Sequence, residues 1–146
     1  MSLRTMNFLT ILLVVCAATA YAAAPDFKEG EWSVSYQMEV TGMPFQMPPI
    51  TTKRTMCLDK NNYVPDNSQP GQDCKISDQK VNGNVVTWVM TCRTQERIIE
   101  GQGKITYEGT RYDGVMNAKL ISTDTPGTPV SYKYIMQGQR LGACGK

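Results

Sequence analysis

The 146-residue sequence contains no histidine. The absence of histidine disfavours catalysis by a Ser-His-Asp triad or a Cys-His pair, because both use histidine as the base. It also disfavours the common zinc and copper sites, in which histidine is a usual ligand. The glycines lie at predicted turns and form neither GxGxxG nor GKS/T, so no phosphate-binding loop is expected. The carboxylates fall on predicted solvent faces or in turns, which disfavours a catalytic acid–base pair. We therefore expect that the chain is not an enzyme and that it needs no cofactor.

The chain also lacks a strong net charge and a long apolar run. Without Arg4, which lies in the predicted leader, 14 of the 15 basic residues remain against 13 acidic residues. Near neutrality gives no electrostatic attraction to nucleic acid, so no nucleic-acid partner is expected. The apolar run at 8–15 is shorter than the roughly 20 apolar residues that span a bilayer, and no later segment approaches that length. We expect no integral membrane segment after cleavage of the leader.

The first residues have the layout of a secretory signal peptide. Arg4 precedes the apolar run at 8–15, and small residues surround Ala22. This pattern predicts a signal peptide at 1–22 and a single exported domain at 23–146. Cys16 offers an alternative interpretation as the lipidated first residue of a lipoprotein, although Val15 precedes it where a small residue is expected.

The stretch from Cys74 to Cys92 predicts a β-hairpin that ends in two thiols. A three-residue loop at 82–84 lets Gly83 take a positive φ and sets the register of two antiparallel strands. In that register three pairs of residues face each other: Val81 with Val85, Ile76 with Met90, and Cys74 with Cys92.

Four cysteines remain after the leader, an even number that predicts a disulfide framework in a small exported chain. The hairpin register pairs Cys74 with Cys92 and leaves Cys57 for Cys144. The alternatives are free thiols or a metal site, but the spacings contain no CxxC and no histidine completes a zinc shell.

Apolar and polar residues alternate with a period of two through most of the remaining chain, which is typical of half-buried strands. Strands are predicted at 31–41, at 50–58, in the hairpin, on both sides of a turn at Gly109, and from Val130 onward. Residues 59–73 predict a long surface loop, and residues 93–102 predict a polar turn region. No apolar stripe at helical spacing occurs outside the leader. These patterns predict an all-β antiparallel meander of about seven or eight strands, as a curled sheet or a small barrel, stapled by two disulfides.

One face of the predicted sheet collects aromatic and methionine side chains. This face encloses either a plain core or a cavity for a small apolar ligand. The residues that we predict to face such a ligand are Trp32, Tyr36, Met38, Trp88 and Met90, and the same face carries Tyr107, Tyr112, Tyr132 and Tyr134.

Methionines gather around the proline-rich segment at 42–50. Thioethers are soft ligands that hold Cu(I), and the spacing GMPFQM lets Met43 and Met47 approach one ion. The alternative is packing, because methionine fills irregular gaps and both Met38 and Met56 lie on predicted strands.

The strings GEWSVSYQMEVTGMPFQMPP, VNGNVVTWVMTC and GQGKITYEGTRYDG and the closing GQRLGAC together resemble the DUF3617 family of small exported bacterial proteins. The resemblance covers nearly all of the domain at 23–146. It implies a Gram-negative periplasmic or envelope setting and an uncharacterised function, and it supplies no catalytic residues. One departure is the segment TRYDG, where Thr110 and Arg111 replace the serine of a GDSY-like string.

These observations predict a periplasmic binding module whose partner is a small apolar ligand or an envelope protein. One alternative is a Cu(I)-handling protein that uses Met43 and Met47. The other is a structural envelope protein with no ligand.

Overall fold

The computed structural model describes residues 24–65, 68, 71–95, 97–122 and 129–145. The predicted signal peptide at 1–22, its Cys16 alternative and most of the loop before Val130 lie outside these residues. The described chain forms seven strands: β1 (Gly30–Thr41), β2 (Ile50–Leu58), β3 (Asp73–Asn82), β4 (Val85–Arg93), β5 (Arg97–Glu108), β6 (Arg111–Ser122) and β7 (Val130–Gly142). The all-β prediction is confirmed.

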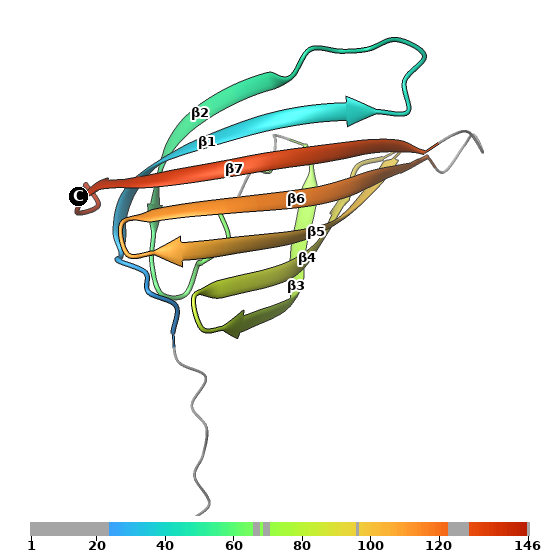
Figure 1. The fold of residues 1–146 in the computed structure, drawn as a ribbon. Helices are drawn as coiled ribbons and strands as arrows, with labels where there is room; N and C mark the ends of the chain where they lie inside the picture. Colours follow the sequence, from blue (N-terminus) through green and yellow to red (C-terminus); the bar gives the residue numbers. More distant parts are fainter. Residues whose placement is uncertain (1–23, 66–67, 69–70, 96, 123–128, 146) are drawn as a thin grey trace, which may run out of the picture.

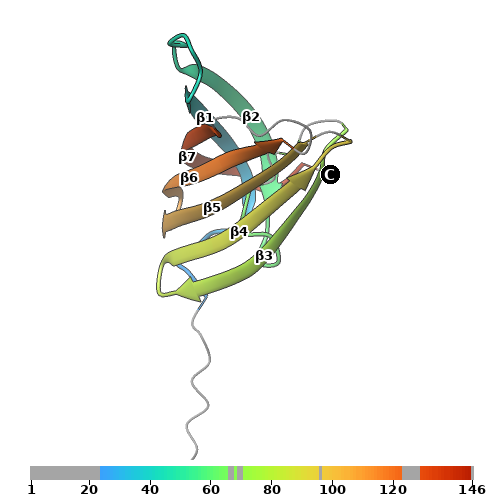
Figure 2. The ribbon, with the colours of Figure 1, turned by 90° about the vertical axis from the view of Figure 1, so that its right-hand side faces the viewer.

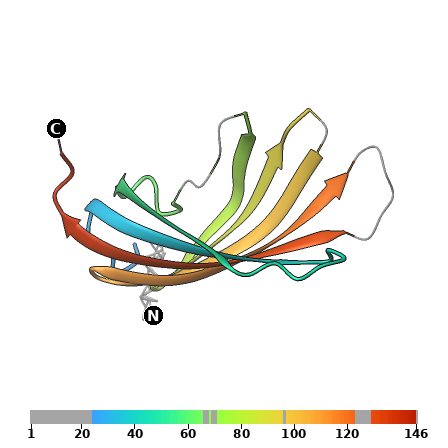
Figure 3. The ribbon, with the colours of Figure 1, turned by 90° about the horizontal axis from the view of Figure 1, so that it is seen from above.

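All seven strands belong to one antiparallel sheet with the order β2-β1-β7-β6-β5-β4-β3. Strands β3 to β7 form a meander in sequence order, and the β1–β2 hairpin joins it through β1 and β7 (Figure 1). The sheet is open, with β2 and β3 at its edges, and it curls into a trough (Figure 3). The curled sheet is therefore the correct alternative and the closed barrel is not.

The inside of the trough, which we call the concave face, carries the core. Along β1 the buried residues Trp32, Val34 and Tyr36 alternate with serines, as the period of two predicts. No described helix covers this face. The segment after β2 turns back over it instead (Figures 1 and 3), and Val64 of that segment is only 3% exposed.

The prediction that 59–73 is a surface loop is therefore wrong for part of its length. Val64 and Pro65 are buried and Tyr63 is half-buried, whereas residues 59–62 are exposed. A curled sheet needs apolar cover on its inner side, and these three residues supply it within an otherwise polar loop.

The predicted hairpin exists, with one correction to its register. Cys74 faces Cys92 and Ile76 faces Met90, as predicted, but Val81 faces Val86 and not Val85. The turn is one residue tighter than expected, with Gly83 at φ 56°. A β-bulge between Ser77 and Lys80 absorbs the extra residue and restores the register of the cysteines.

The prediction of a turn at 93–102 is wrong from Arg97 onward, because β5 begins there and includes Gly101 and Gly103. A Cβ atom on Gly103 would lie 2.1 Å from Cζ2 of Trp88, so the strand needs glycine where the indole crosses it. Gly138 of β7 has the same role beneath Tyr112, whose Cε1 would lie 2.0 Å from an added Cβ.

Both predicted disulfides are confirmed. Cys57 of β2 bonds to Cys144 after a separation of 87 residues, and Cys74 of β3 bonds to Cys92 of β4 after a separation of 18. The first ties an edge strand to the segment that follows β7. The second links neighbouring strands at the other edge.

Candidate functional site

The concave face has two unlike ends, and the first is filled by an aromatic cluster. We call this the closed end and define it by Phe27, Trp32, Tyr63, Tyr107 and Tyr112. Phe27 stacks on Trp32 at 5.6 Å between ring centroids and meets Tyr107 edge to face at 5.0 Å. Tyr112 lies 5.7 Å from Trp32 and 5.4 Å from Tyr107. Such offset and edge-to-face pairs add to the stabilisation from burial.

Polar atoms of the closed end are partly satisfied by the covering backbone. Nε1 of Trp32 donates a hydrogen bond to the carbonyl of Lys28 over 3.1 Å, and the hydroxyl of Tyr107 donates to the carbonyl of Tyr63. The hydroxyl of Tyr112 is buried and has no hydrogen-bond partner among the described residues. Burial, with a smaller effect of Tyr36, raises the pKa of both Tyr107 and Tyr112 well above the ordinary range. The closed end is therefore packed core.

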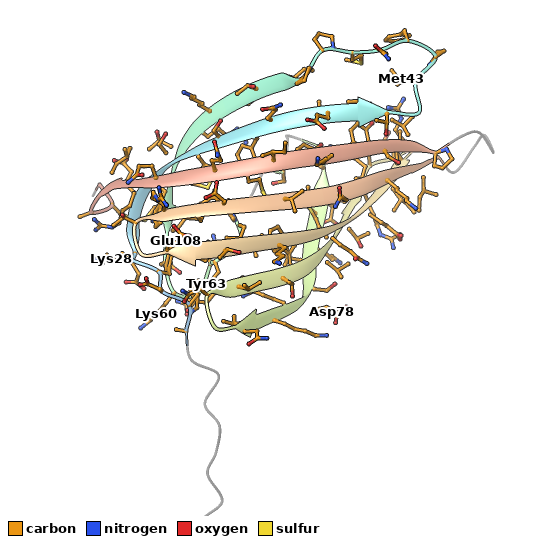
Figure 4. All side chains as sticks on the ribbon, viewed as in Figure 1. Lys28, Met43, Lys60, Tyr63, Asp78 and Glu108 are labelled. Atoms are coloured by element: carbon orange, nitrogen blue, oxygen red, sulfur yellow. A yellow bond between two sulfur atoms is a disulfide. The ribbon has the colours of Figure 1, made fainter. Side chains whose placement is uncertain are left out.

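The second end, which we call the open end, consists of half-buried side chains on the same face. They come from β1, β5, β6 and β7 and are Met38, Ile99, Leu120, Tyr132 and Tyr134. Burial raises the pKa of the Tyr134 phenol, and nearby Tyr132 adds to the shift. Figure 4 labels Tyr63 at the closed end and Met43 beyond the opposite end of β1.

Three hollows lined by described residues open on the concave face. The first has a volume of about 240 Å³ and lies beside Trp88, between the covering residues Val64 and Pro65 and the strand residues Met90 and Met136. Nε1 of Trp88 is buried without a hydrogen-bond partner among the described residues.

The second and third hollows lie at the open end and have volumes of about 310 and 610 Å³. They share part of their lining, namely Met38, Gln72, Ile99 and Tyr134. Met90 lines both the first and the second hollow, so the three follow one another along the face. The second also includes Arg54 and Thr52 of β2, and the third includes Arg97 of β5.

All five predicted ligand-facing residues lie on the concave face, but one of them belongs to the packed closed end and the other four line hollows. Trp32 is fully buried in the aromatic cluster and lines none of the three hollows. Tyr36 and Met38 line the second hollow, Trp88 lines the first, and Met90 lines both.

Sequence reasoning did not select several residues in these walls. Ile99 lies in the segment that was predicted as a turn, and Val64 in the segment predicted as a surface loop. Arg54 sits on a predicted strand, but its face follows only from its pairing with Val34 in the β1–β2 ladder. The alternation of β2 alone was too weak to identify it.

The predicted copper ligands lie apart from the hollows. Met43 and Met47 belong to the segment between β1 and β2, which extends beyond the rest of the sheet (Figures 2 and 4), and Met43 is 38% exposed. Met38 instead lines two hollows, and Met56 faces Trp32 in the ladder. The described residues include no group of three or more His, Cys, Asp or Glu side chains that could hold a metal ion. Thioether ligation by Met43 and Met47 stays a prediction.

The fold is an open antiparallel sheet with two disulfides, bonds of a kind that persist in oxidising compartments. A family model described as "Protein of unknown function (DUF3617)" matches residues 27–144, and the chain belongs to this family. The match spans all seven strands and both disulfides. No curated protein and no solved structure matches the chain. Nowhere in the described part of the chain is there a helix long and apolar enough to cross a membrane.

Proposed function

We propose that this protein is a periplasmic binding module that holds a small apolar ligand at the open end of the concave face. One observation carries the proposal: the second and third hollows share a floor of Met38, Ile99 and Tyr134, and these side chains are only half-buried, unlike the packed closed end of the same face. The proposal involves binding without chemical conversion of the ligand.

The size and lining of the hollows support this function. Ligand pockets usually have volumes of about 300 to 1,000 Å³ and mostly apolar walls with a few polar groups. The two open-end hollows, of about 310 and 610 Å³, fall within that range. A ligand that covers the shared floor removes apolar surface from water, which stabilises the complex by about 25 cal/mol per Å².

Export to the periplasm is supported by the disulfides and by the predicted signal peptide at 1–22. The mature domain would reach an oxidising compartment, where Cys57–Cys144 and Cys74–Cys92 form. Detection of the chain in an osmotic-shock fraction of its host, with cleavage mapped after Ala22, tests this part of the proposal.

The binding function is tested with Nile red, a neutral probe whose fluorescence rises in apolar surroundings. We expect saturable, stoichiometric binding to the purified protein. Met38→Trp fills the shared floor and should weaken probe binding at least about tenfold. Met43→Trp is the matched control, because it adds the same side chain to the exposed β1–β2 connection and should leave the affinity unchanged.

Two outcomes would contradict the proposal. Binding that never saturates would mean that the hollows hold no ligand, and a structural envelope role would then be favoured. Saturable binding that is equally weakened by Met38→Trp and Met43→Trp would place the probe elsewhere. Far-ultraviolet circular dichroism of each variant confirms that it is folded.

A further inference from the structure

Arginine is the only type of charged side chain among the described residues that line the three concave hollows. Arg54 lies in the wall of the second hollow and Arg97 in the wall of the third, and no described lining residue is acidic. Arg54 faces Val34 across the β1–β2 ladder, so its side chain leaves β2 on the concave side. Arg97 is two residues from Ile99 in β5 and shares its face.

Neither guanidinium forms an ion pair with a described residue. The ion pairs found there are Arg111 with Glu108 at 2.6 Å and Lys133 with Glu39 at 3.9 Å, and both lie on the convex side of the sheet. A convex hollow is likewise lined by charges of both signs: Glu39, Glu100, Lys119 and Lys133. Charges of both signs thus share the outside of the curl, with two ion pairs among them, whereas the charged side chains described in the three concave hollows are two arginines without an ion-pair partner among the described residues.

The apolar floor continues between the two arginines, since Met38, Ile99 and Tyr134 line both open-end hollows. A guanidinium donates two parallel hydrogen bonds to a carboxylate or a phosphate. An alkyl chain on the floor would therefore bring an acidic head group within reach of a cation at the rim. A neutral ligand would leave that cation without a partner.

We infer that the ligand is a single-chain amphiphile with an anionic head group, whose chain lies on the shared floor and whose head group meets Arg54 or Arg97. This inference rests on the proposed function and adds the chemical class of the ligand. In this inference the two arginines select ligands with an anionic head group, and the apolar floor of Met38, Ile99 and Tyr134 provides most of the binding affinity for the alkyl chain.

Displacement of Nile red from the purified protein by dodecanoate and by dodecanol, at a pH where the acid is ionised, tests the inference. The two compounds have the same chain and differ in charge. We expect dodecanoate to bind about tenfold more tightly than dodecanol. At least one of Arg54→Gln and Arg97→Gln should weaken dodecanoate binding about fivefold, and the double variant should abolish the preference for dodecanoate over dodecanol.

Lys53→Gln is the matched control, because Lys53 is next to Arg54 in β2 but lines a hollow on the convex face with Ser33 and Ser35. It removes the same charge from the same strand and should leave the preference intact. Dodecyl phosphate in a parallel arm distinguishes a phosphate head group from a carboxylate, and tighter binding of either one over dodecanol supports the inference.

The outcomes separate the inference from the proposed function. Saturable Nile red binding combined with equal affinities for dodecanoate, dodecyl phosphate and dodecanol would overturn the anionic head group and leave the apolar site in place. A preference that survives in the double arginine variant, or that Lys53→Gln also removes, would overturn the assignment to Arg54 and Arg97. Absence of saturable Nile red binding would overturn both.

Discussion

The closed and open ends of the concave face are built from the same strands, yet only one of them is filled. In β1, Trp32 is fully buried at the closed end, whereas Met38 is half-buried at the open end. In β5, Tyr107 is fully buried and Ile99 is half-buried in the same way. The residue types at both ends are apolar or aromatic, so composition alone does not explain the difference.

The difference comes from what covers each end. Residue Phe27 of the lead-in to β1 bridges to Gly109, and Tyr63 and Val64 of the segment after β2 complete the cover of the closed end. The described chain supplies no equivalent cover for Met38, Tyr132 and Tyr134. The candidate binding site at the open end is therefore explained by the lack of covering residues there, and not by a different type of residue on the strands.

The largest expected effect concerns the disulfides, one of which lies near each end. Cys57 faces Glu31 beside Trp32, whereas Cys74 and Cys92 line the hollows. The double variant Cys57→Ser/Cys144→Ser should lower the free energy of unfolding by about 4 to 5 kcal/mol, and Cys74→Ser/Cys92→Ser by about 3 kcal/mol, because the first bond closes the longer loop. Urea unfolding measures both values.

Only the variant Cys74→Ser/Cys92→Ser should alter the affinity for Nile red. An equal change in affinity in both double variants would contradict the division of the face into two ends.

Truncation of one apolar side chain at each end gives the next largest effect. Trp32→Ala should lower the free energy of unfolding by about 3 to 5 kcal/mol, because it removes a fully buried indole from the aromatic cluster. Met38→Ala should lower it by about 1 kcal/mol, since its side chain is half-buried. Urea unfolding should show the larger loss of stability for Trp32→Ala. Nile red titration should show the larger loss of probe affinity for Met38→Ala. The comparison fails if Trp32→Ala is the milder change in stability.

A glycine substitution tests whether Trp88 is held in place by β5. Gly103→Ala should lower the free energy of unfolding by about 1 to 3 kcal/mol, because the new Cβ would overlap the indole of Trp88. Gly142→Ala in β7 is the control, since an added Cβ there meets nothing within 4 Å. Near-ultraviolet circular dichroism should report a displaced indole only in Gly103→Ala. Equal stability of the two variants would show that the indole moves freely.

Alkaline pH should weaken the closed end. The unfolded chain ionises its tyrosines near pH 10, while burial raises the folded-state pKa of Tyr107 and Tyr112, so the free energy of unfolding should fall as the pH rises above about 10. Tyr112→Phe should reduce this fall and change stability at neutral pH by no more than about 1 kcal/mol, since its hydroxyl has no described partner.

Tyr107→Phe is the companion variant, because its hydroxyl donates a hydrogen bond to the carbonyl of Tyr63. It should reduce the alkaline fall similarly but lower the free energy of unfolding at neutral pH by about 0.5 to 1.5 kcal/mol. Urea unfolding at several pH values measures both effects. An alkaline fall that is identical in wild type and both variants would show that these phenols do not govern it.

The smallest effect on stability is expected beyond the open end. Met43→Leu/Met47→Leu should change the free energy of unfolding by less than about 0.5 kcal/mol, because the β1–β2 connection is exposed. The Cu(I) hypothesis predicts that the wild-type protein binds Cu(I) more tightly than this variant in an anaerobic titration. Equal, weak binding by both proteins would exclude the hypothesis.

Much of the fold could be predicted from the sequence because it is local. The period of two predicted β1, and the count of residues along one hairpin predicted that Cys74 faces Cys92. The tighter turn and the bulge cancelled each other, so the cysteine register was correct although Val81 was misplaced. The predictions that were wrong concern residues whose structure depends on distant partners. Gly101 and Gly103 look like turn residues in the sequence, and only the fold shows that Gly101 lies against Ala118 and Gly103 against Trp88.

The candidate site was harder to predict for the same reason. Alternation identified Tyr36 and Met38 as inward residues, but the order of strands, with β1 beside β7, brings Met38 opposite Tyr134. The cover by Val64 comes from a segment with no regular structure of its own. Which inward residues are packed and which line a hollow therefore could not be read from periodicity.

The bulge opposite Trp88 also affects how copies of this chain can meet. An open sheet has two unpaired edges, and each is a template for strand addition by another molecule. At β3 the bulge interrupts the ladder between Ser77 and Lys80, and Asp78 adopts a positive φ of 49°, so that edge is irregular. At β2 the ladder with β1 continues without a shift from Ile50 to Leu58. Irregular geometry therefore protects the β3 edge of this domain against edge-to-edge aggregation, whereas the regular β2 edge has only the charges of Lys53 and Arg54 for the same purpose.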